Sequence, residues 1–353
     1  MDERERLHWV DIARAFFIIA IVFGHIVESG IVYKWFFSFH VPAFFFISGY
    51  CFKFDENWGK YIGKKIKSIV IPYVVFSILS IVFFAALAYI VPSVGELLNC
   101  NLIENLKIMV YGNSKPDVMK YNMPLWFLTC FFCVTLLAYG SEIITRSYTK
   151  NFRYITIVIG ILTGAFMSRH ETIAWPWHLE TAFSMLVWYL LGIEAAERDI
   201  FNLITSKVKN KKTRYGLSFI LIAAGGALAM LNIRVVGVRN EHYGLLWNYY
   251  LAAAIQIMGF SLLSISIGKN KILEYLGRNS LSVLVMHKFP IFAIQLIPII
   301  SVLVEEGNTL IGNSVGFVAC AFVILITLLM GEIIKLIFPV ALGMQRKKRL
   351  RND

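Results

Sequence analysis

Four ionisable side chains lie in or beside the first long apolar run of the sequence, residues 10–29. Two of them, Arg14 and His25, are eleven residues apart, which in an α-helix is three full turns plus about 20°. They therefore share one face of the predicted helix, about 16 Å apart along its axis. A guanidinium binds anionic groups, and a neutral imidazole accepts protons. The spacing predicts an anion-binding group near one end of the helix and a base near the other.

The other two charged residues of this run stand beside that pair. Asp11 lies one turn before Arg14, within reach of an i,i+3 ion pair, and Glu28 is expected one turn after His25 on the same helical face. A charge at mid-bilayer costs about 2.5–3.5 kcal/mol on insertion scales, so such residues normally face the interior of a bundle and mark a site. A purely structural Asp11–Arg14 pair, with Arg14 extended towards the membrane surface, is the alternative interpretation.

The second apolar run, 35–52, also carries polar side chains. Ser38 and His40 lie in its outer half, and Pro42 is expected to bend the helix because it removes a backbone N–H. His40 and His25 enter the same half of the membrane from consecutive spans, which favours a shared reactive cavity. A packed, hydrogen-bonded histidine is the alternative for His40.

A third polar segment, 276–290, places Arg278 at the cytoplasmic start of a predicted helix. His287 and Lys288 lie further along the same helix, and a buried Lys288 would require an anion.

Tryptophans with polar neighbours form the fourth group. Trp126 opens a predicted span, and Trp175, Trp177 and His178 lie together in a short outer loop. Such aromatic faces suit a sugar ring, and they equally suit the membrane interface.

The composition indicates what positions these residues. Of the 353 residues, 58% are apolar and only 16% are charged, against about 25% charged in soluble domains. The sequence therefore predicts an all-α, polytopic membrane bundle that forms a single domain over 1–353. We expect about ten spans of roughly 20 residues each, at 8–27, 33–52, 68–91, 123–140, 153–168, 179–196, 215–232, 244–267, 280–302 and 309–338.

The distribution of basic residues predicts the orientation. With the N-terminus in the cytoplasm, 24 of the 34 Lys and Arg residues fall in cytoplasmic segments and 7 in outer loops. This positive-inside bias places both termini in the cytoplasm and agrees with an even number of spans. It also explains the net charge of +12 without nucleic-acid binding. No cleavable signal peptide is recognised, the five cysteines have no metal spacing, and nothing in the sequence indicates an oligomeric state.

Taken together, these segments resemble the acyltransferase-3 family of integral membrane O-acyltransferases. The resemblance rests on the Arg14–ten residues–His25 spacing after "DIARA", on "FSFHVPAFFFISGY", and on "LGRNSLSVLVMHKFP". "PLWFL" and the Trp–Pro–Trp loop are similar to the branch that acetylates sugars. Some relatives carry an additional extracellular hydrolase-like domain, which we do not recognise in this sequence.

The resemblance implies an acyl-CoA as donor, with acetyl-CoA as the expected one, a glycan or other hydroxyl compound as acceptor, no metal, and a multi-pass location in a bacterial cytoplasmic membrane. Arg14 would then bind the donor phosphates, with Asp11 holding it. His25 would act as base or acyl carrier, with Glu28 fixing its tautomer and His40 or Ser38 donating to the oxyanion.

Further donor contacts are expected from Arg278, His287 and Lys65, and acceptor contacts from Trp126, Trp175, Trp177 and His178. The acceptor remains open among peptidoglycan, lipopolysaccharide, capsule, a secreted glycan and a small metabolite.

Two other classes of protein are compatible with the same residues. Buried charges and proline-interrupted spans also suit a transporter or flippase of a small solute or lipid-linked sugar. A membrane receptor or scaffold is the third class, in which each buried ionisable residue would be individually replaceable.

Overall fold

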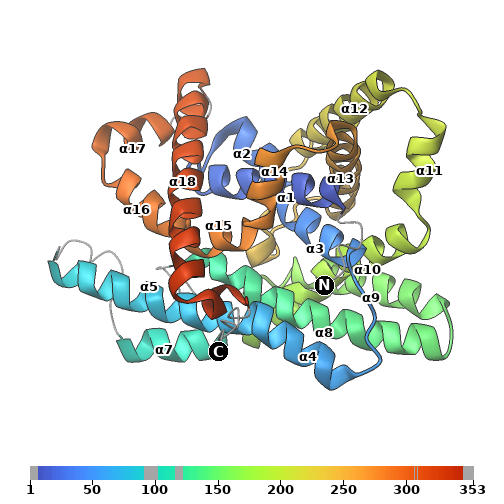
Figure 1. Cartoon of the computed structure of the whole chain (residues 1–353), viewed down its shortest axis with the longest axis horizontal. Coiled ribbons are helices and arrows are strands. Elements are labelled where there is room, and N and C mark those ends of the chain that lie inside the picture. Colours follow the sequence, from blue (N-terminus) through green and yellow to red (C-terminus); the bar gives the residue numbers. More distant parts are fainter. Residues whose placement is uncertain (1–6, 91–101, 116–121, 306, 308, 345–353) are drawn as a thin grey trace, which may run out of the picture.

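The computed structural model of the chain is built from helices (Figure 1). It describes residues 7–90, 102–115, 122–305, 307 and 309–344. Within these residues the one β-type pairing is an isolated bridge between Gly237 and His242. The all-α prediction is confirmed.

Seven described helices or helix pairs are long and apolar enough to cross a membrane. They coincide with seven of the ten expected spans, and they establish an integral, multi-pass membrane protein. They are α2–α3 (Gly30–Phe37 and His40–Tyr50), α4–η1–α5 (Trp58–Lys65, Ile66–Val70 and Ile71–Ile90), η2–α8 (Met123–Leu125 and Trp126–Ser147), η3–α10 (Pro176–His178 and Leu179–Glu197), α12 (Lys211–Met230), α13 (Leu246–Ile267) and α18 (Leu310–Ile337).

The three other expected spans are also helical, but they are shorter or interrupted. They correspond to α1 (His8–Gly24), α9 (Asn151–Met167) and the series α15, α16 and α17 (Ser280–Met286, Lys288–Gln295 and Pro298–Glu305). The remaining helical elements are short: α7 (Leu102–Tyr111), α11 (Ile200–Lys207), η4 (Val238–Asn240), α14 (Lys271–Arg278) and η5 (Pro339–Leu342).

Helix α1 ends at Gly24, three residues earlier than predicted, and His25 is its C-cap. The ring of Phe37 packs directly against this glycine, where a Cβ atom would lie 2.3 Å from the ring. The chain leaves the helix at this contact. The prediction that Glu28 continues the helical face of His25 is therefore wrong, since Glu28 lies in the connection to α2.

The second span is interrupted, but before Pro42 and not at it. Helix α2 ends at Phe37, Ser38 and Phe39 form a turn, and α3 begins at His40. Pro42 is the third residue of α3, where a backbone N–H has no intrahelical partner, so proline is tolerated there. The predicted bend is real, and its position was wrong.

The ninth span is not the continuous helix that was expected over 280–302. Pro290 lacks the N–H that would bond to the carbonyl of Met286, and the helix is interrupted at His287. A second interruption precedes Pro298. Two prolines thus divide this span into α15, α16 and α17, which lie beside α18 (Figure 1).

Helix α1 is enclosed by other helices over most of its length. It packs against α14, α13, α3, α18, α2 and α15. The closest approach is to α14, where a Cβ on Gly277 would lie 1.7 Å from the Asp11 carbonyl oxygen. In the middle of α1, Phe17 and Ile18 are completely buried. The prediction that this charged helix faces the bundle interior is confirmed.

A buried ion cluster joins α8, α9 and α10. The guanidinium of Arg153 donates to both oxygens of Glu142, at 2.7 and 2.8 Å. It also donates to Glu194 at 2.5 Å and to Glu197 at 2.8 Å. The bidentate hydrogen bonds join the three helices. Removal of one partner would leave a buried charge without compensation, which is strongly destabilising.

Candidate active site

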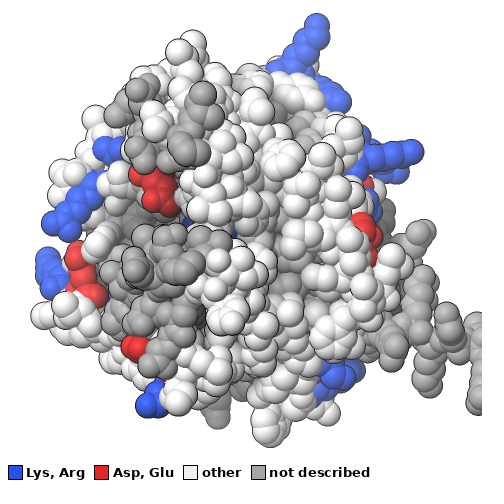
Figure 2. All heavy atoms as spheres, turned by 90° about the vertical axis from the view of Figure 1, so that its left-hand side faces the viewer, with Lys and Arg blue, Asp and Glu red and all other residues white. Residues whose placement is uncertain are grey.

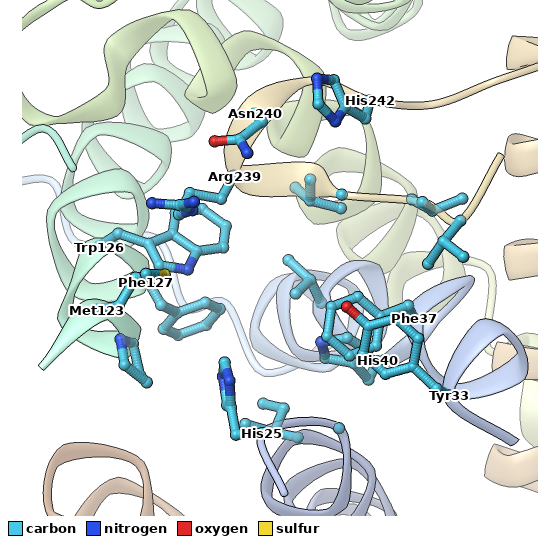
Figure 3. A pocket seen from close by; sticks show the side chains of 18 of the residues that line it. His25, Tyr33, Phe37, His40, Met123, Trp126, Phe127, Arg239, Asn240 and His242 are labelled. Atoms are coloured by element: carbon cyan, nitrogen blue, oxygen red, sulfur yellow. The ribbon is translucent and has the colours of Figure 1, made fainter. Parts of the chain in front are cut away.

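A pocket of about 400 Å³ opens where α1 ends. Figure 3 shows three groups of side chains that face one another across it. His25 stands at the end of α1, Tyr33, Phe37 and His40 come from the second span, and Met123, Trp126 and Phe127 come from η2 and α8. The fourth wall is the outer turn that carries Arg239, Asn240 and His242.

His25 points into this pocket and is stacked on a second imidazole. The ring centroids of His25 and His287 lie 5.2 Å apart, with an interplanar angle of 29°. The backbone N–H of His25 donates to the carbonyls of Ile21 and Val22, each at 3.1 Å, which fixes the end of α1. Offset ring pairs of this kind contribute about 0.5–1.5 kcal/mol, so His287 helps to hold the His25 ring in place.

The tautomer of His287 follows from its own contact. Its Nδ1 lies 2.9 Å from the carbonyl oxygen of Val283, so Nδ1 carries the proton. Its Nε2 is buried and has no hydrogen-bond partner among the residues that the structure describes. His287 is completely buried, and it contributes to the site through His25.

His40 lines the pocket, and Ser38 is used elsewhere. Nδ1 of His40 lies 2.7 Å from the carbonyl oxygen of Phe36 and donates to it, so the Nε2 of a neutral ring is an acceptor. The hydroxyl of Ser38 donates to the Trp35 carbonyl at 2.6 Å and accepts from Gln256 at 2.8 Å. Ser38 connects α2 with α13, away from the lining of the pocket.

The outer wall is a short, closed turn. Gly237 and His242 exchange two backbone hydrogen bonds, of 2.8 and 3.1 Å, around the residues between them. Arg239 lies in this turn and donates to the carbonyl of Ser114 at 2.9 Å. The turn therefore presents Arg239 and Asn240 to the pocket from a fixed backbone (Figure 3).

A buried ion cluster anchors this turn from behind. Lys115 pairs with Glu241 and lies 3.3 Å from Oε1 of Glu180, and the hydroxyl of Thr181 donates to Glu241. Burial lowers the pKa of Lys115, and the neighbouring Glu180 carboxylate opposes this lowering. The cluster joins three outer segments, so the position of Arg239 depends on residues far apart in the sequence.

The tryptophans predicted to contact an acceptor do not all reach the pocket. Trp126 lines it, and the ring of His178 packs behind Trp126 with the centroids 5.4 Å apart. The ring of Trp177 packs against Tyr73 and Phe132, and its indole N–H donates to the Val110 carbonyl.

Trp175, with 39% of its surface exposed, donates its backbone N–H to Glu180. Nε2 of His178 accepts from the backbone N–H of Ser114 at 3.0 Å. Trp175 and His178 thus support the outer cluster, one layer behind the pocket.

Three of the predicted donor residues, Asp11, Arg14 and Arg278, lie at the opposite end of α1. Asp11 and Arg14 form the expected i,i+3 pair, with 3.8 Å between Oδ1 and Nη1. Arg278 follows Gly277, whose backbone contacts Asp11, so Arg278 belongs to the same end. Lys65 lies over the ring of Tyr61, on α4 where this helix packs against α8.

The described lining of the pocket reaches along α1 only to Ile21. Between Ile21 and Arg14, the buried side chains of Phe17 and Ile18 fill the space beside the helix. A ligand that connected Arg14 with His25 would therefore have to displace core side chains.

Residues 7–332 match the family model of the acyltransferase 3 domain, which is most of the chain. The chain belongs to the acyltransferase 3 family. Membership implies an acyltransferase enzyme that takes an acyl donor and an acceptor. No curated protein and no solved structure matches the chain significantly.

In this acyltransferase the pocket collects His25, Glu28, His40 and Trp126 from the predicted site residues. Glu28 reaches it from the loop after α1, although the helical reasoning that pointed to it was wrong. His287, which was expected among the donor contacts, lies instead against His25.

Sequence reasoning missed the outer wall of the pocket, with Tyr33 and the turn at Arg239, Asn240 and His242. A signal was present, because four polar residues follow one another at 239–242 in a short outer loop. Among the described residues, no three His, Cys, Asp or Glu side chains form a group able to hold a metal ion.

Proposed function

We propose that this acyltransferase transfers an acyl group, with acetyl as the smallest candidate, from cytoplasmic acyl-CoA to a hydroxyl of a cell-surface or lipid-linked glycan. The observation that carries the proposal is the position of His25. Its imidazole lies in a pocket on one side and ends a buried helix that leads to Arg14 on the other. A base at this point can serve a donor that arrives along α1 and an acceptor that enters the pocket.

In the direct reaction, the acceptor hydroxyl gives its proton to the free ring nitrogen of His25 as its oxygen attacks the thioester carbonyl. The resulting tetrahedral intermediate expels the CoA sulfur, which takes up the proton from the imidazolium. The products are an O-acyl ester and the CoA thiol. In the alternative, His25 itself attacks the thioester and carries the acyl group until the acceptor hydroxyl displaces it.

The developing oxyanion requires hydrogen-bond donors. His40 and Ser38 were the expected donors, but the hydrogens on His40 Nδ1 and on Ser38 already go to backbone carbonyls. A neutral His40 is then an acceptor towards the pocket. We assign oxyanion stabilisation instead to Arg239 and Tyr33, whose N–H and O–H groups belong to the same pocket.

Donor binding is assigned to the opposite end of α1. The phosphates of CoA would contact Arg14 and Arg278, with Asp11 orienting Arg14 and Lys65 as a more distant contact. The pantetheine arm would extend from there along α1 towards His25. Because Phe17 and Ile18 fill this path, donor binding includes a movement of core side chains.

The acceptor is assigned to the outer part of the pocket. Trp126 offers an aromatic face, and Asn240 and Glu28 offer polar groups for sugar hydroxyls. Trp175, Trp177 and His178 support this wall from behind, so we expect weaker effects from their replacement than from that of Trp126. With both termini in the cytoplasm of a bacterial cell, the acceptor would be met on the outer side of the cytoplasmic membrane.

The purified protein tests this function against a transporter. Incubation with acyl-CoA should release free CoA thiol, and this release should rise when an acceptor glycan is added. Mass spectrometry of surface glycans with and without the gene should show an acyl group that depends on the protein. Uptake of a solute without any thioester turnover would instead support a transporter.

A further inference from the structure

A second, smaller pocket of about 240 Å³ lies directly beside the first. Five of its eight lining residues are aliphatic, and the other three are polar. They are Ile26, Ile291, Ile294, Ile300 and Val304, with Glu28, Ser29 and Gln295. Apart from Ile300, the aliphatic residues are at least nine-tenths buried, so they form walls and not a flat surface.

The two pockets meet at the segment that follows α1. His25 lines the first pocket, its neighbour Ile26 lines the second, and Glu28 lines both. Consecutive Cα atoms are only about 3.8 Å apart. The segment that carries His25 therefore forms a wall between the two pockets, and an apolar group in the second pocket lies next to the pocket that contains the imidazole.

The outer walls of this pocket come from α16 and α17, the short helices created by Pro290 and Pro298. A continuous ninth span would have no such pair of half-length helices. Interrupted helices at membrane depth are typical of binding sites, because irregular backbone is tolerated there only beside protein or a cavity. Figure 2 shows the side of the molecule on which α16 and α17 lie, and most of its described surface is uncharged, with the charged groups mainly towards the edges.

The chemistry of the lining selects the occupant. Apolar cavities exclude water and bind apolar molecules, as a cavity of about 150 Å³ lined by Leu, Ile and Phe does with benzene. The second pocket is larger than that and smaller than the roughly 300 Å³ at which drug-sized ligand sites begin. It fits a short hydrocarbon chain.

The position of the second pocket beside the His25 pocket indicates which hydrocarbon chain it receives. The acyl chain of the donor starts at the carbonyl carbon, which must be at His25 when it is attacked. The hydrocarbon of a lipid-linked glycan starts only beyond at least one sugar ring and its linkage. We propose that the second pocket receives the acyl chain of the donor, and that the acyl group transferred is therefore longer than acetyl. The proposal rests on the acyl-CoA reaction proposed above.

Turnover of a donor series tests this assignment. The purified protein is given acetyl-, butanoyl-, hexanoyl- and octanoyl-CoA, and release of CoA thiol is followed with water as the acceptor. Burial of one CH₂ contributes about 0.8 kcal/mol, which is about a fourfold gain in kcat/KM for each added methylene that enters the pocket. We expect a rise from acetyl to butanoyl or hexanoyl, followed by a fall once the pocket is full.

Two substitutions at one position change the pocket in opposite directions. Ile294→Trp fills it and should shift the optimum back towards acetyl, while Ile294→Ala enlarges it and should shift the optimum towards octanoyl. The ratio between donors is the readout, since a misfolded variant loses all donors equally. Val302→Trp is the matched control, because Val302 lies on α17 with 59% of its surface exposed and should keep the wild-type profile.

A wild-type optimum at acetyl, or a profile that neither Ile294 variant moves, would overturn the proposal while leaving acyl transfer intact. The second pocket would then belong to a lipid of the bilayer or to a lipid-linked acceptor. Absence of turnover with every donor would overturn the proposed function itself, and this inference with it.

Discussion

The His25 ring is held by contacts that come from distant parts of the chain. Its backbone is fixed by the end of α1, its ring by His287, and the space before it by side chains of α8 and the outer turn. His287, the side chains of α8 and the outer turn are all far from His25 in the sequence. A histidine held in this way can act on a substrate without first having to be ordered.

Replacement of Arg14 should weaken the use of acyl-CoA as donor. Charge-assisted hydrogen bonds to phosphate contribute about 1.5–3 kcal/mol, so Arg14→Ala should lower kcat/KM for acyl-CoA about tenfold to a hundredfold. Arg14→Lys keeps the charge and should lose less. The measurement is steady-state release of CoA thiol by the purified variants.

A thioester donor that lacks the nucleotide distinguishes a role of Arg14 in donor binding from a role in the structure of the protein. Hydrolysis of S-acetyl-N-acetylcysteamine, which has no phosphates, should be the same in Arg14→Ala and in the wild type. Equal losses with both donors would mean that Arg14 supports the structure through Asp11 and does not bind the donor.

At the scale of the elements, the sequence predicted where helices form better than where they stop. Hydrophobic length located all ten helical segments, because a run of about 20 apolar residues has no other stable state in lipid. Helix α1 ends at Gly24, where the ring of Phe37 packs against the backbone, and this tertiary contact is not visible in the local sequence. The glycine and proline positions were visible, but which of them would interrupt a helix depended on the neighbouring helices.

The candidate site was also predictable only in part: single residues could be predicted, and their tertiary contacts could not. His25 and His40 were predictable because histidine is expensive in a membrane and both occupy the outer half of their spans. The contact between His25 and His287 was not, since it depends on how α15 packs against α1. The wall at Arg239 also escaped prediction, because a loop residue carries no periodicity that shows which way it points.

The Arg153 cluster yields a prediction about stability. Arg153→Met leaves the completely buried carboxylate of Glu142 without its bidentate partner, which should cost about 3–5 kcal/mol. Arg146, whose side chain is 46% exposed, pairs with Glu142 and Glu197 at longer distances. Arg146→Met is therefore the matched control and should cost less than about 1 kcal/mol.

Thermal unfolding of both variants in the same detergent measures the difference. The lower midpoint should belong to Arg153→Met, while its kcat at a temperature well below that midpoint stays close to the wild-type value. Equal midpoints for the two variants would show that the cluster is not what joins α8, α9 and α10.

At the scale of the whole molecule, the reaction requires a donor side and an acceptor side. Arg14 lies near one end of α1, and the pocket with His25 lies at the opposite end. If the N-terminus is cytoplasmic, the donor end faces the supply of acyl-CoA and the pocket faces the glycan.

Labelling of single cysteines in intact cells tests this orientation. In a variant whose native cysteines are replaced by serine, Arg169→Cys should react with a membrane-impermeant maleimide, and Lys209→Cys should react only after the cells are broken. Both positions are exposed in the structure, so accessibility does not favour either one. The reverse labelling pattern would place the pocket on the cytoplasmic side and would contradict a surface glycan as acceptor.

We expect the His25 imidazole to perform the acyl transfer, and a comparison of three purified proteins measures whether it does. Release of CoA from acyl-CoA is measured for the wild type, for His25→Ala, and for His170→Ala, whose exposed ring packs only against Phe166 among the described aromatic residues. General base catalysis contributes about 10²–10⁴-fold. We expect a loss of about 10²–10⁴-fold in His25→Ala, in a protein that still unfolds cooperatively with a midpoint lowered only by the loss of the His287 contact, and wild-type activity in His170→Ala. Full activity in a folded His25→Ala protein would contradict this role of His25.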